Sequence, residues 1–183
     1  MNEKERLLEL LKSNALQIGT FRLSSGRTSD YYMDCNRVTL SAEGAYLTAK
    51  LMMDMILPEV SAVGGLTIGA DPILSSLALL SHVHDRNIAA LIIRKDLKNH
   101  GTMKFVEGPI LEKGAKVAVV EDVVASGDSL LRAVECIAAA GYEPVQTLTL
   151  FDRQEGGREA IEKRGYILQA LFSCKDLNIT KSN

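Results

Sequence analysis

The sequence contains no tryptophan, and only 5% of its 183 residues are aromatic. Few side chains are therefore available to stack on the bases of a single-stranded nucleic acid. Acidic residues outnumber lysine and arginine by 23 to 21, which leaves a formal net charge of −2 at neutral pH. This charge provides no overall basic field that would attract a phosphate backbone. We therefore expect no nucleic-acid partner.

Long hydrophobic runs are also absent, because no apolar stretch approaches the roughly 20 residues that cross a bilayer. The N-terminal segment, M-N-E-K-E-R-L-L-E-L-L, lacks the basic and long apolar regions of a signal peptide. Three cysteines occur, at positions 35, 136 and 174. Their odd number and wide spacing fit reduced thiols better than a disulfide framework or a zinc site. We expect a cytoplasmic protein without a membrane partner.

The length and the hydrophobic fraction, 46%, are those of a single globular domain with a sizeable core. From residue 60 onward, short apolar runs alternate with helical patterns. This alternation predicts right-handed βαβ units, and hence an α/β fold with a mostly parallel central sheet flanked by helices. The expected strands are 60–64, 88–93, 116–120, 144–151 and 166–172, and the expected helices are 71–84, 129–140 and 155–164.

The first part of the chain falls outside this alternation. We expect a helix with its apolar face near residues 7–15, a short strand at 21–23, a turn at 24–27, a strand at 29–36 and a helix at 42–57. The early strands predict a small N-terminal hood of about residues 1–40 over the C-terminal edge of the sheet. The core would then span about residues 41–175.

The most informative stretch is residues 117–130, V-A-V-V-E-D-V-V-A-S-G-D-S-L. An apolar run ends in Glu121 and Asp122, and a turn of small residues leads into a helical pattern. Ligands of open α/β sheets bind at the carboxyl ends of the strands, where this pattern places both acids. The turn also offers backbone N–H groups at a helix N-terminus, which suit a phosphate. A ribose phosphate needs both features, although an ordinary strand–turn–helix with a polar loop is the alternative.

The segment E-D-V-V-A-S-G-D-S closely resembles the phosphoribosyl-pyrophosphate (PRPP) motif of type I phosphoribosyltransferases. The resemblance implies a type I phosphoribosyltransferase-like fold. It also implies that the acids bind the ribose hydroxyls and favour a cationic sugar, and that the loop binds the 5′-phosphate. The implied PRPP contacts are Glu121, Asp122, Val123, Val124, Ala125, Ser126, Gly127, Asp128 and Ser129, the first two of them catalytic.

The polar segment R-K-D-L-K-N-H-G-T, residues 94–102, follows the strand that ends at position 93. A charge cluster is often only a solvated loop, but a long loop after a parallel strand is typical of a functional lid. The segment resembles the mobile catalytic loop of orotate phosphoribosyltransferases, which reaches across a dimer interface. The resemblance implies a homodimer in which the 94–108 loop completes the neighbouring subunit's site. It makes Lys98 the catalytic lysine, and the implied PRPP contacts are Arg94, Lys95, Lys98 and His100.

Two further segments point to the base. Residues 21–34, F-R-L-S-S-G-R-T-S-D-Y-Y-M-D, resemble the N-terminal segment of orotate phosphoribosyltransferases, in which Tyr32 and Met33 match positions that line the pyrimidine pocket. Arg153 lies at the end of an expected strand, where a guanidinium can fork onto a carboxylate. By resemblance Arg153 is an orotate contact; the alternative is a surface arginine paired with Asp152 or Glu155.

The sequence departs from the family pattern at two positions. Some members have a lysine where this chain has Ser24, and many have an orotate-contacting threonine where it has Ala125.

The turn V-G-G-L-T-I-G-A-D-P, residues 63–72, is a weaker signal: its three glycines permit a close backbone approach to pyrophosphate.

Together the resemblances imply a pentosyltransferase of pyrimidine biosynthesis. It would transfer ribose 5-phosphate from PRPP to N1 of orotate, giving orotidine 5′-monophosphate and pyrophosphate in de novo UMP synthesis. The implied cofactor is Mg²⁺, held mainly through PRPP and water rather than by a dedicated protein site. The alternatives are a type I phosphoribosyltransferase for another base and a non-catalytic PRPP-binding regulator.

Overall fold

A six-stranded sheet forms the centre of the computed structural model, which describes residues 1–22, 26, 28–95 and 105–179. The strand order is β5-β4-β3-β6-β7-β8, and every neighbouring pair is parallel except β4 and β5. The expected mostly parallel α/β fold is therefore confirmed. The strands are β3 (Ala62–Leu66), β4 (Ala89–Ile93), β5 (Val106–Glu107), β6 (Lys116–Val124), β7 (Glu143–Asp152) and β8 (Leu168–Ser173).

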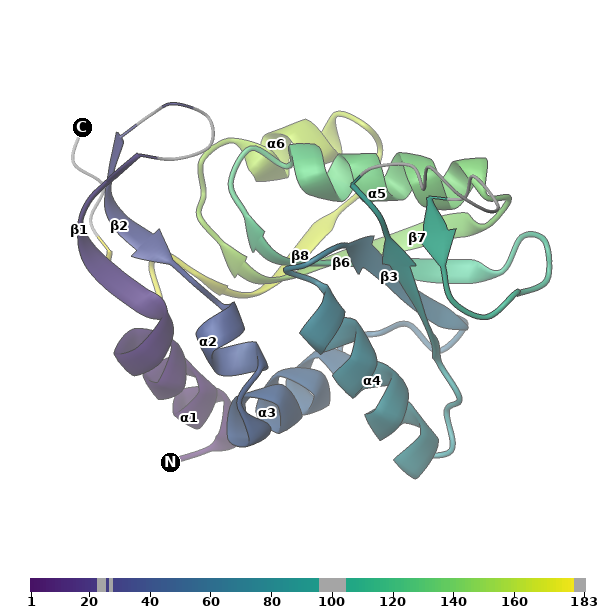
Figure 1. Cartoon of the computed structure of the whole chain (residues 1–183), viewed down its shortest axis with the longest axis horizontal. Helices are drawn as coiled ribbons and strands as arrows, with labels where there is room; N and C mark the ends of the chain where they lie inside the picture. The colour runs from purple at the N-terminus through teal and green to yellow at the C-terminus, as the bar shows by residue number, and fades with distance from the viewer. Residues whose placement is uncertain (23–25, 27, 96–104, 180–183) are drawn as a thin grey trace.

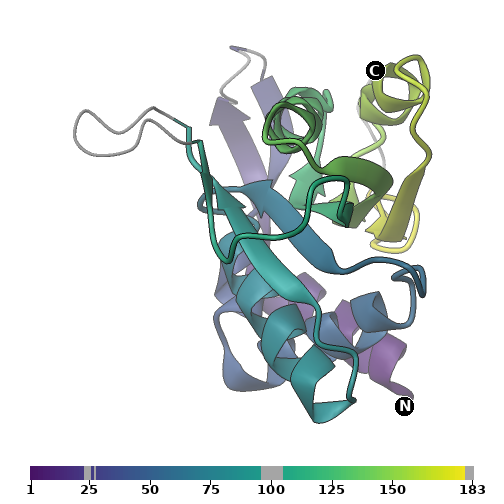
Figure 2. The ribbon, with the colours of Figure 1, turned by 90° about the vertical axis from the view of Figure 1, so that its right-hand side faces the viewer.

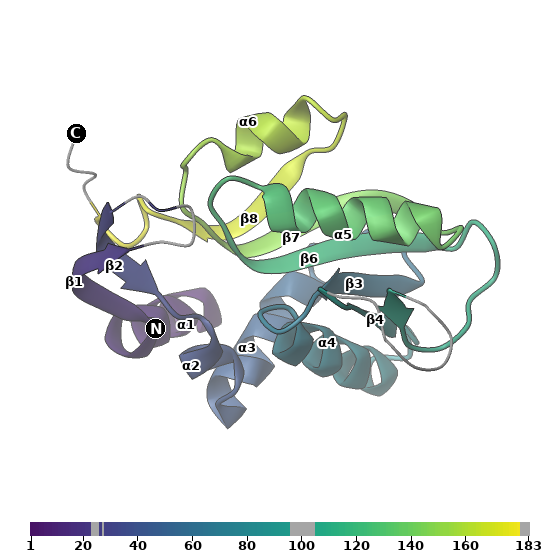
Figure 3. The ribbon, with the colours of Figure 1, turned by 45° about the horizontal axis from the view of Figure 1, so that its top comes forward.

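Helices cover both faces of this sheet (Figures 2 and 3). One face carries α3 (Ala42–Met53) and α4 (Asp71–Val83), and the other carries α5 (Asp128–Ala139) and α6 (Gly157–Glu162). Successive residues of β6 pack alternately into the two apolar clusters, with Val120 toward α3 and α4 and Val119 toward α5. Burial on both faces explains why the central strands read as continuous apolar runs. Within the described ranges, no helix is both long and apolar enough to cross a membrane.

The strand order reverses between β3 and β6. Helix α4 carries the chain from β3 to β4 on one side, whereas β6 pairs with β3 on the other side. Such a switch point opens a crevice outside the carboxyl ends of the two strands, where ligands of this architecture bind. The loop after β3 and the end of β6 therefore border the expected binding crevice.

The N-terminal part forms a hood at one end of the sheet (Figure 1). Its two strands pair with each other in an antiparallel sheet of their own. Leu7, Leu11 and Met33 are buried in the same apolar cluster as α3 and α4, which fixes the hood to the core. The elements are α1 (Glu3–Leu10), a π-helical turn η1 (Leu11–Ala15), β1 (Leu16–Arg22), β2 (Thr28–Met33) and the short α2 (Asn36–Thr39).

Several predicted boundaries were wrong. Strand β6 continues to Val124 instead of ending at Val120, because β7 goes on pairing with it as far as Val124↔Asp152. Strand β1 begins at Leu16 rather than Phe21, and most of its residues are exposed or half-buried, so hydrophobic alternation could not mark its start. Helix α2 and the two-residue strand β5 were not predicted, since both are too short to show a period.

Candidate active site

The two predicted acids lie near the end of β6, beside the switch point. Glu121 is buried, with 6% of its surface exposed, and its Oε2 has no hydrogen-bond partner among the described residues. Asp122 is half-buried, and its Oδ1 accepts a hydrogen bond of 2.8 Å from the Val123 N–H. Successive strand residues point to opposite faces of a sheet, so the acids leave β6 in different directions. Both lie within the strand rather than after it.

The buried position of Glu121 changes its acidity. Burial raises the pKa of its carboxyl well above the ordinary value, and the neighbouring Asp122 charge raises it further, while the Lys95 ammonium acts in the opposite sense. A buried carboxyl oxygen without a donor costs free energy. The hydroxyl groups of a ribose would supply such donors, so this pair suits a vicinal diol.

The loop after β6 has the form of an anion site. Gly127 has a left-handed backbone, with φ of 87°, and directly precedes α5. The first N–H groups of a helix have no partner within it and attract anions. The loop approaches α6 closely at Gly157, where a Cβ atom would lie 2.5 Å from the Ala125 carbonyl oxygen, so a glycine is required at this position. The Ser126 hydroxyl donates to Asp128 Oδ2 over 2.8 Å.

The glycines of the weaker signal have different surroundings. Gly64 and Gly65 lie inside β3, and a Cβ atom at Gly65 would lie 2.4 Å from the Val120 carbonyl oxygen. Of the three, only Gly69 lies in the turn, where a Cβ atom would lie 2.4 Å from Asp122 Oδ1. Packing inside the sheet thus accounts for two of the glycines, and contact with the acid pair accounts for the third.

Arg153 follows β7 and lies next to the loop after β6. Its backbone N–H donates to the Val124 carbonyl oxygen over 2.8 Å, directly before Ala125. The residue is 4% exposed, and its Nη2 lies 2.8 Å from Glu155 Oε1 and 3.0 Å from Ser29 Oγ. Pairing with Glu155 was the alternative to a ligand role, but the arginine is buried rather than on the surface. Asp152 pairs with Arg158 instead.

The hood brings a different tyrosine to Arg153 than the one singled out in the sequence. Tyr31 is buried, and its ring centroid lies 4.5 Å from the Arg153 guanidinium carbon. Tyr32 is 42% exposed, with its ring 5.7 Å from that of Phe21, whereas Met33 is buried in the core. Residues two apart in a strand share a face, so the sequence alone could have assigned Tyr31 and Met33 to one face of β2 and Tyr32 to the other.

Of the polar segment 94–102, only Arg94 and Lys95 lie among the described residues. Lys98 and His100 lie outside the described residues. The Arg94 N–H donates to the Phe105 carbonyl oxygen over 2.8 Å, and the Arg94 side chain pairs with Glu107 at 3.7 Å. The Lys95 carbonyl oxygen accepts a hydrogen bond from Arg132 of α5. The segment therefore leaves and re-enters the sheet through the antiparallel β4–β5 pair.

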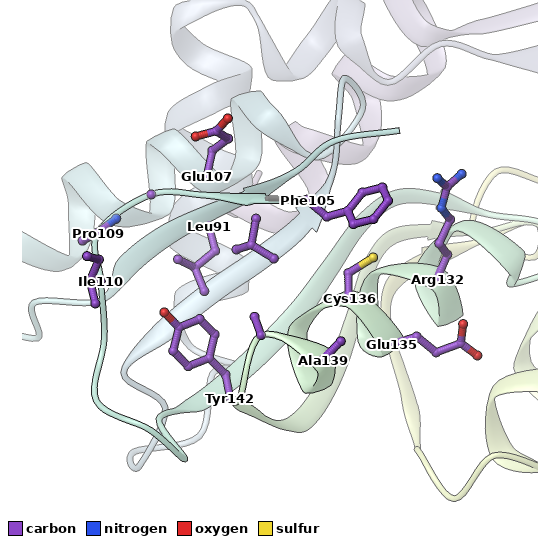
Figure 4. Close-up of a pocket in the computed structure, with 13 residues that line it drawn as sticks. Leu91, Phe105, Glu107, Pro109, Ile110, Arg132, Glu135, Cys136, Ala139 and Tyr142 are labelled. Carbon is purple, nitrogen blue, oxygen red and sulfur yellow. The ribbon is translucent and has the colours of Figure 1, made fainter. Parts of the chain in front are cut away.

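A separate cavity of about 770 Å³ lies between this β4–β5 pair and α5. Figure 4 shows the side chains of Leu91, Phe105, Cys136 and Tyr142 around it. Its lining includes neither acid of β6 nor Arg153. The cavity is therefore distinct from the crevice at the switch point.

Comparisons with known proteins agree with this geometry. The profile of the phosphoribosyl transferase domain family matches residues 63–170. An orotate phosphoribosyltransferase of Thermosynechococcus vestitus is 47% identical over 174 residues, which cover 95% of this chain and 92% of that relative. The chain belongs to the orotate phosphoribosyltransferase family. The resemblance stated from the sequence is thereby confirmed.

Solved structures of the orotate phosphoribosyltransferase family share the fold. The Mycobacterium tuberculosis H37Rv orotate phosphoribosyltransferase in complex with Fe(III) dicitrate is 36% identical and has a TM-score of 0.83, covering 96% of this chain and 99% of that one. The same enzyme in complex with PRPP is 34% identical and has a TM-score of 0.80, covering 97% and 99%. The type I phosphoribosyltransferase fold is therefore confirmed along nearly the whole chain.

Proposed function

We propose that this family member transfers ribose 5-phosphate from PRPP to N1 of orotate, with Mg²⁺, as a cytoplasmic homodimer. One observation supports the assignment of the site: the backbone N–H of the buried Arg153 donates to the Val124 carbonyl oxygen, two residues after Asp122 and directly before the loop that follows β6. The loop after β6, the acid pair and the arginine would bind a phosphate, a vicinal diol and a carboxylate, respectively. PRPP together with orotate has all three.

The ribose phosphate would occupy the end of β6. Glu121 and Asp122 accept hydrogen bonds from the ribose hydroxyls, and the backbone N–H groups of residues 125–129 bind the 5′-phosphate. Breaking the bond between C1 and pyrophosphate leaves positive charge on the sugar. The negative field of Asp122, joined by that of Glu121 when its carboxyl is ionised, favours that charge, so the chain contributes positioning and electrostatic stabilisation.

The base would be oriented by Arg153. Its guanidinium can form two charge-assisted hydrogen bonds to the orotate carboxylate. Glu155 at 2.8 Å compensates the buried cation before the base arrives. Orotate's N1 is already acidic, so the transfer requires no strong base from the protein. Tyr32, Met33 and Ala125 remain proposed contacts to the ring on the strength of the family resemblance.

The residues at the switch point fit a magnesium ion held mostly by substrate. Carboxylate oxygens are the donors that Mg²⁺ prefers, and Glu121 presents a buried oxygen without a partner among the described residues. In the described part of the chain, no three His, Cys, Asp or Glu side chains gather into a metal site. Glu121 and Asp122 would hold the ion through PRPP and water, and the ion would neutralise charge on the pyrophosphate.

The cations of the 94–108 loop would act on the leaving group. We assign Lys98 of the neighbouring subunit the neutralisation of pyrophosphate, with Arg94, Lys95 and His100 as further PRPP contacts. Removing one such electrostatic contact typically lowers kcat by about 10²–10³-fold.

The test follows orotate loss by ultraviolet absorbance, with PRPP, in the presence and absence of Mg²⁺, beside a panel of purine and pyrimidine bases. We expect loss of orotate alone, and only with Mg²⁺. Turnover of another base would contradict the pocket assignment, and PRPP binding without any turnover would favour a regulator.

A further inference from the structure

The buried arginine is held by the hood through two separate contacts. The first is the Tyr31 ring of β2, whose centroid lies 4.5 Å from the guanidinium carbon of Arg153. The second is the Ser29 hydroxyl of the same strand, 3.0 Å from Arg153 Nη2. A guanidinium over an aromatic face is attracted to it, and the attraction strengthens when both are removed from water. Both partners here are at most 5% exposed.

A third contact ties Tyr31 to the main chain of the same arginine. The Tyr31 hydroxyl lies 3.2 Å from Cys174 Sγ, and this thiol donates to the Arg153 carbonyl oxygen over 3.2 Å. Cys174 directly follows β8, so three elements converge on one residue. The tyrosine thus reaches Arg153 at its side chain and, through the thiol, at its backbone.

The contact of Tyr31 with the Arg153 side chain and its contact with the Arg153 backbone have different consequences. The Arg153 backbone is already fixed by its 2.8 Å bond to the Val124 carbonyl oxygen. Its side chain is held instead by contacts with other side chains. Glu155 competes there for the same nitrogen atoms that would bind a substrate carboxylate. The guanidinium carbon lies over the Tyr31 ring, so the ring would restrict how the guanidinium turns if it exchanged Glu155 for a substrate carboxylate. The ring, rather than the hydroxyl, would then be the part that affects substrate binding.

We propose that Tyr31 is a positioning residue for the base: its ring holds the Arg153 guanidinium in the orientation that receives the orotate carboxylate. The inference rests on the proposed contact between Arg153 and orotate. It makes the hood a determinant of base affinity through a residue that the base itself need not touch.

The experiment compares steady-state constants of Tyr31→Leu, which removes the ring, and Tyr31→Phe, which removes only the hydroxyl. We expect Tyr31→Leu to raise KM for orotate about tenfold, with kcat and KM for PRPP within about threefold of wild type. Tyr31→Phe should keep KM for orotate within about twofold. If Tyr31→Leu does not fold, Tyr31→Met removes the ring with an unbranched, more adaptable side chain and provides the same comparison.

A double-mutant cycle with Arg153→Ala separates the inference from the proposed function. If Tyr31 acts through the arginine, Tyr31→Leu should raise KM for orotate by less than about twofold in the Arg153→Ala background. The same tenfold rise in both backgrounds, or an unchanged KM in Tyr31→Leu alone, would overturn the role of Tyr31. Equal weakening of orotate and PRPP, with a lowered Tm, would reduce Tyr31 to a structural residue. An unchanged KM for orotate in Arg153→Ala itself would instead overturn the proposed arginine contact.

Discussion

At the scale of single residues, the proposed site contains ionisable side chains that are buried away from water. Glu121 has a buried oxygen without a partner among the described residues, and Arg153 is 4% exposed beside Glu155. Such groups cost stability unless a partner offsets the cost. In the proposed complex, the substrate hydroxyls would supply the partner for Glu121 and the orotate carboxylate would replace Glu155 on Arg153, so the cost of burying Glu121 would be offset on binding.

The raised pKa of Glu121 predicts a pH-dependent effect of Glu121→Gln. The folded protein retains a proton that the unfolded chain releases, so wild-type stability falls as pH rises from about 4.5, the ordinary value for glutamate, through the raised pKa. The glutamine variant lacks this loss. Its free energy of unfolding relative to wild type should therefore increase as pH rises from 5 to 8, as measured by urea denaturation.

PRPP binding by Glu121→Gln gives a second readout. The variant should bind PRPP more weakly, because an amide cannot present two acceptor oxygens to the ribose hydroxyls. A difference in unfolding free energy that stays constant from pH 5 to pH 8 would contradict the raised pKa.

At the scale of elements, much of the architecture follows from the sequence, and the remainder depends on pairing across the fold. The apolar run before Glu121 predicted β6, because a strand that is buried on both faces is apolar along its length. The helical period after Ser129 predicted α5, because a helix that is buried along one stripe repeats its apolar residues at helical spacing. The end of β6 depends on β7, and β1 has a mostly exposed surface, so neither boundary is encoded locally. The PRPP motif predicts a role for the two acids, and the position of Arg153 at the end of a parallel strand predicts one for the arginine. Tyr31 and Cys174 join Arg153 across 122 and 21 positions, a contact that no local pattern contains.

Strand β3 and the turn that follows it give a matched pair of glycine substitutions, at Gly65 in the strand and at Gly69 in the turn. A methyl group at Gly69 would lie 2.4 Å from the Asp122 carboxylate, a side chain that can move aside. We expect Gly69→Ala to keep the Tm within a few degrees of wild type while raising KM for PRPP about tenfold, because Asp122 is displaced from its position.

Gly65→Ala is the contrasting variant. Its methyl group would lie 2.4 Å from the Val120 carbonyl oxygen, which belongs to the backbone of β6. Overpacking of this kind typically costs about 1–3 kcal/mol, so Gly65→Ala should lower the Tm clearly. Thermal unfolding and PRPP kinetics on both proteins make the comparison. Loss of stability without loss of PRPP affinity in Gly69→Ala would contradict the contact with Asp122.

At the scale of the whole molecule, the proposed active site joins two subunits. Within one chain, the proposed site would combine residues at the carboxyl ends of β3, β6 and β7, at the end of the sheet that carries the hood (Figure 1). The proposed pyrophosphate contacts come from the 94–108 loop of a second copy. Closed twofold dimers are the commonest symmetric assembly and give two equivalent sites of this kind.

Mixing two inactive variants tests this arrangement. Lys98→Ala leaves the acid pair intact, and Asp122→Asn leaves the loop intact, so a mixed dimer would contain one complete site. A 1:1 mixture after subunit exchange should recover roughly a quarter of the wild-type rate, since half of the dimers are mixed and one site in two is complete. Verified mixed dimers without activity would show that each site is built within one chain.

The most direct test of the account is the KM for orotate and for PRPP in Arg153→Ala. The guanidinium is proposed to bind the carboxylate that distinguishes orotate from other bases, so its removal should raise KM for orotate about 100-fold or more while KM for PRPP stays within about threefold. That result would place the base beside the phosphate loop at the end of β7. An unchanged KM for orotate, or an equal loss for both substrates, would contradict the assignment of Arg153 and with it the proposed site.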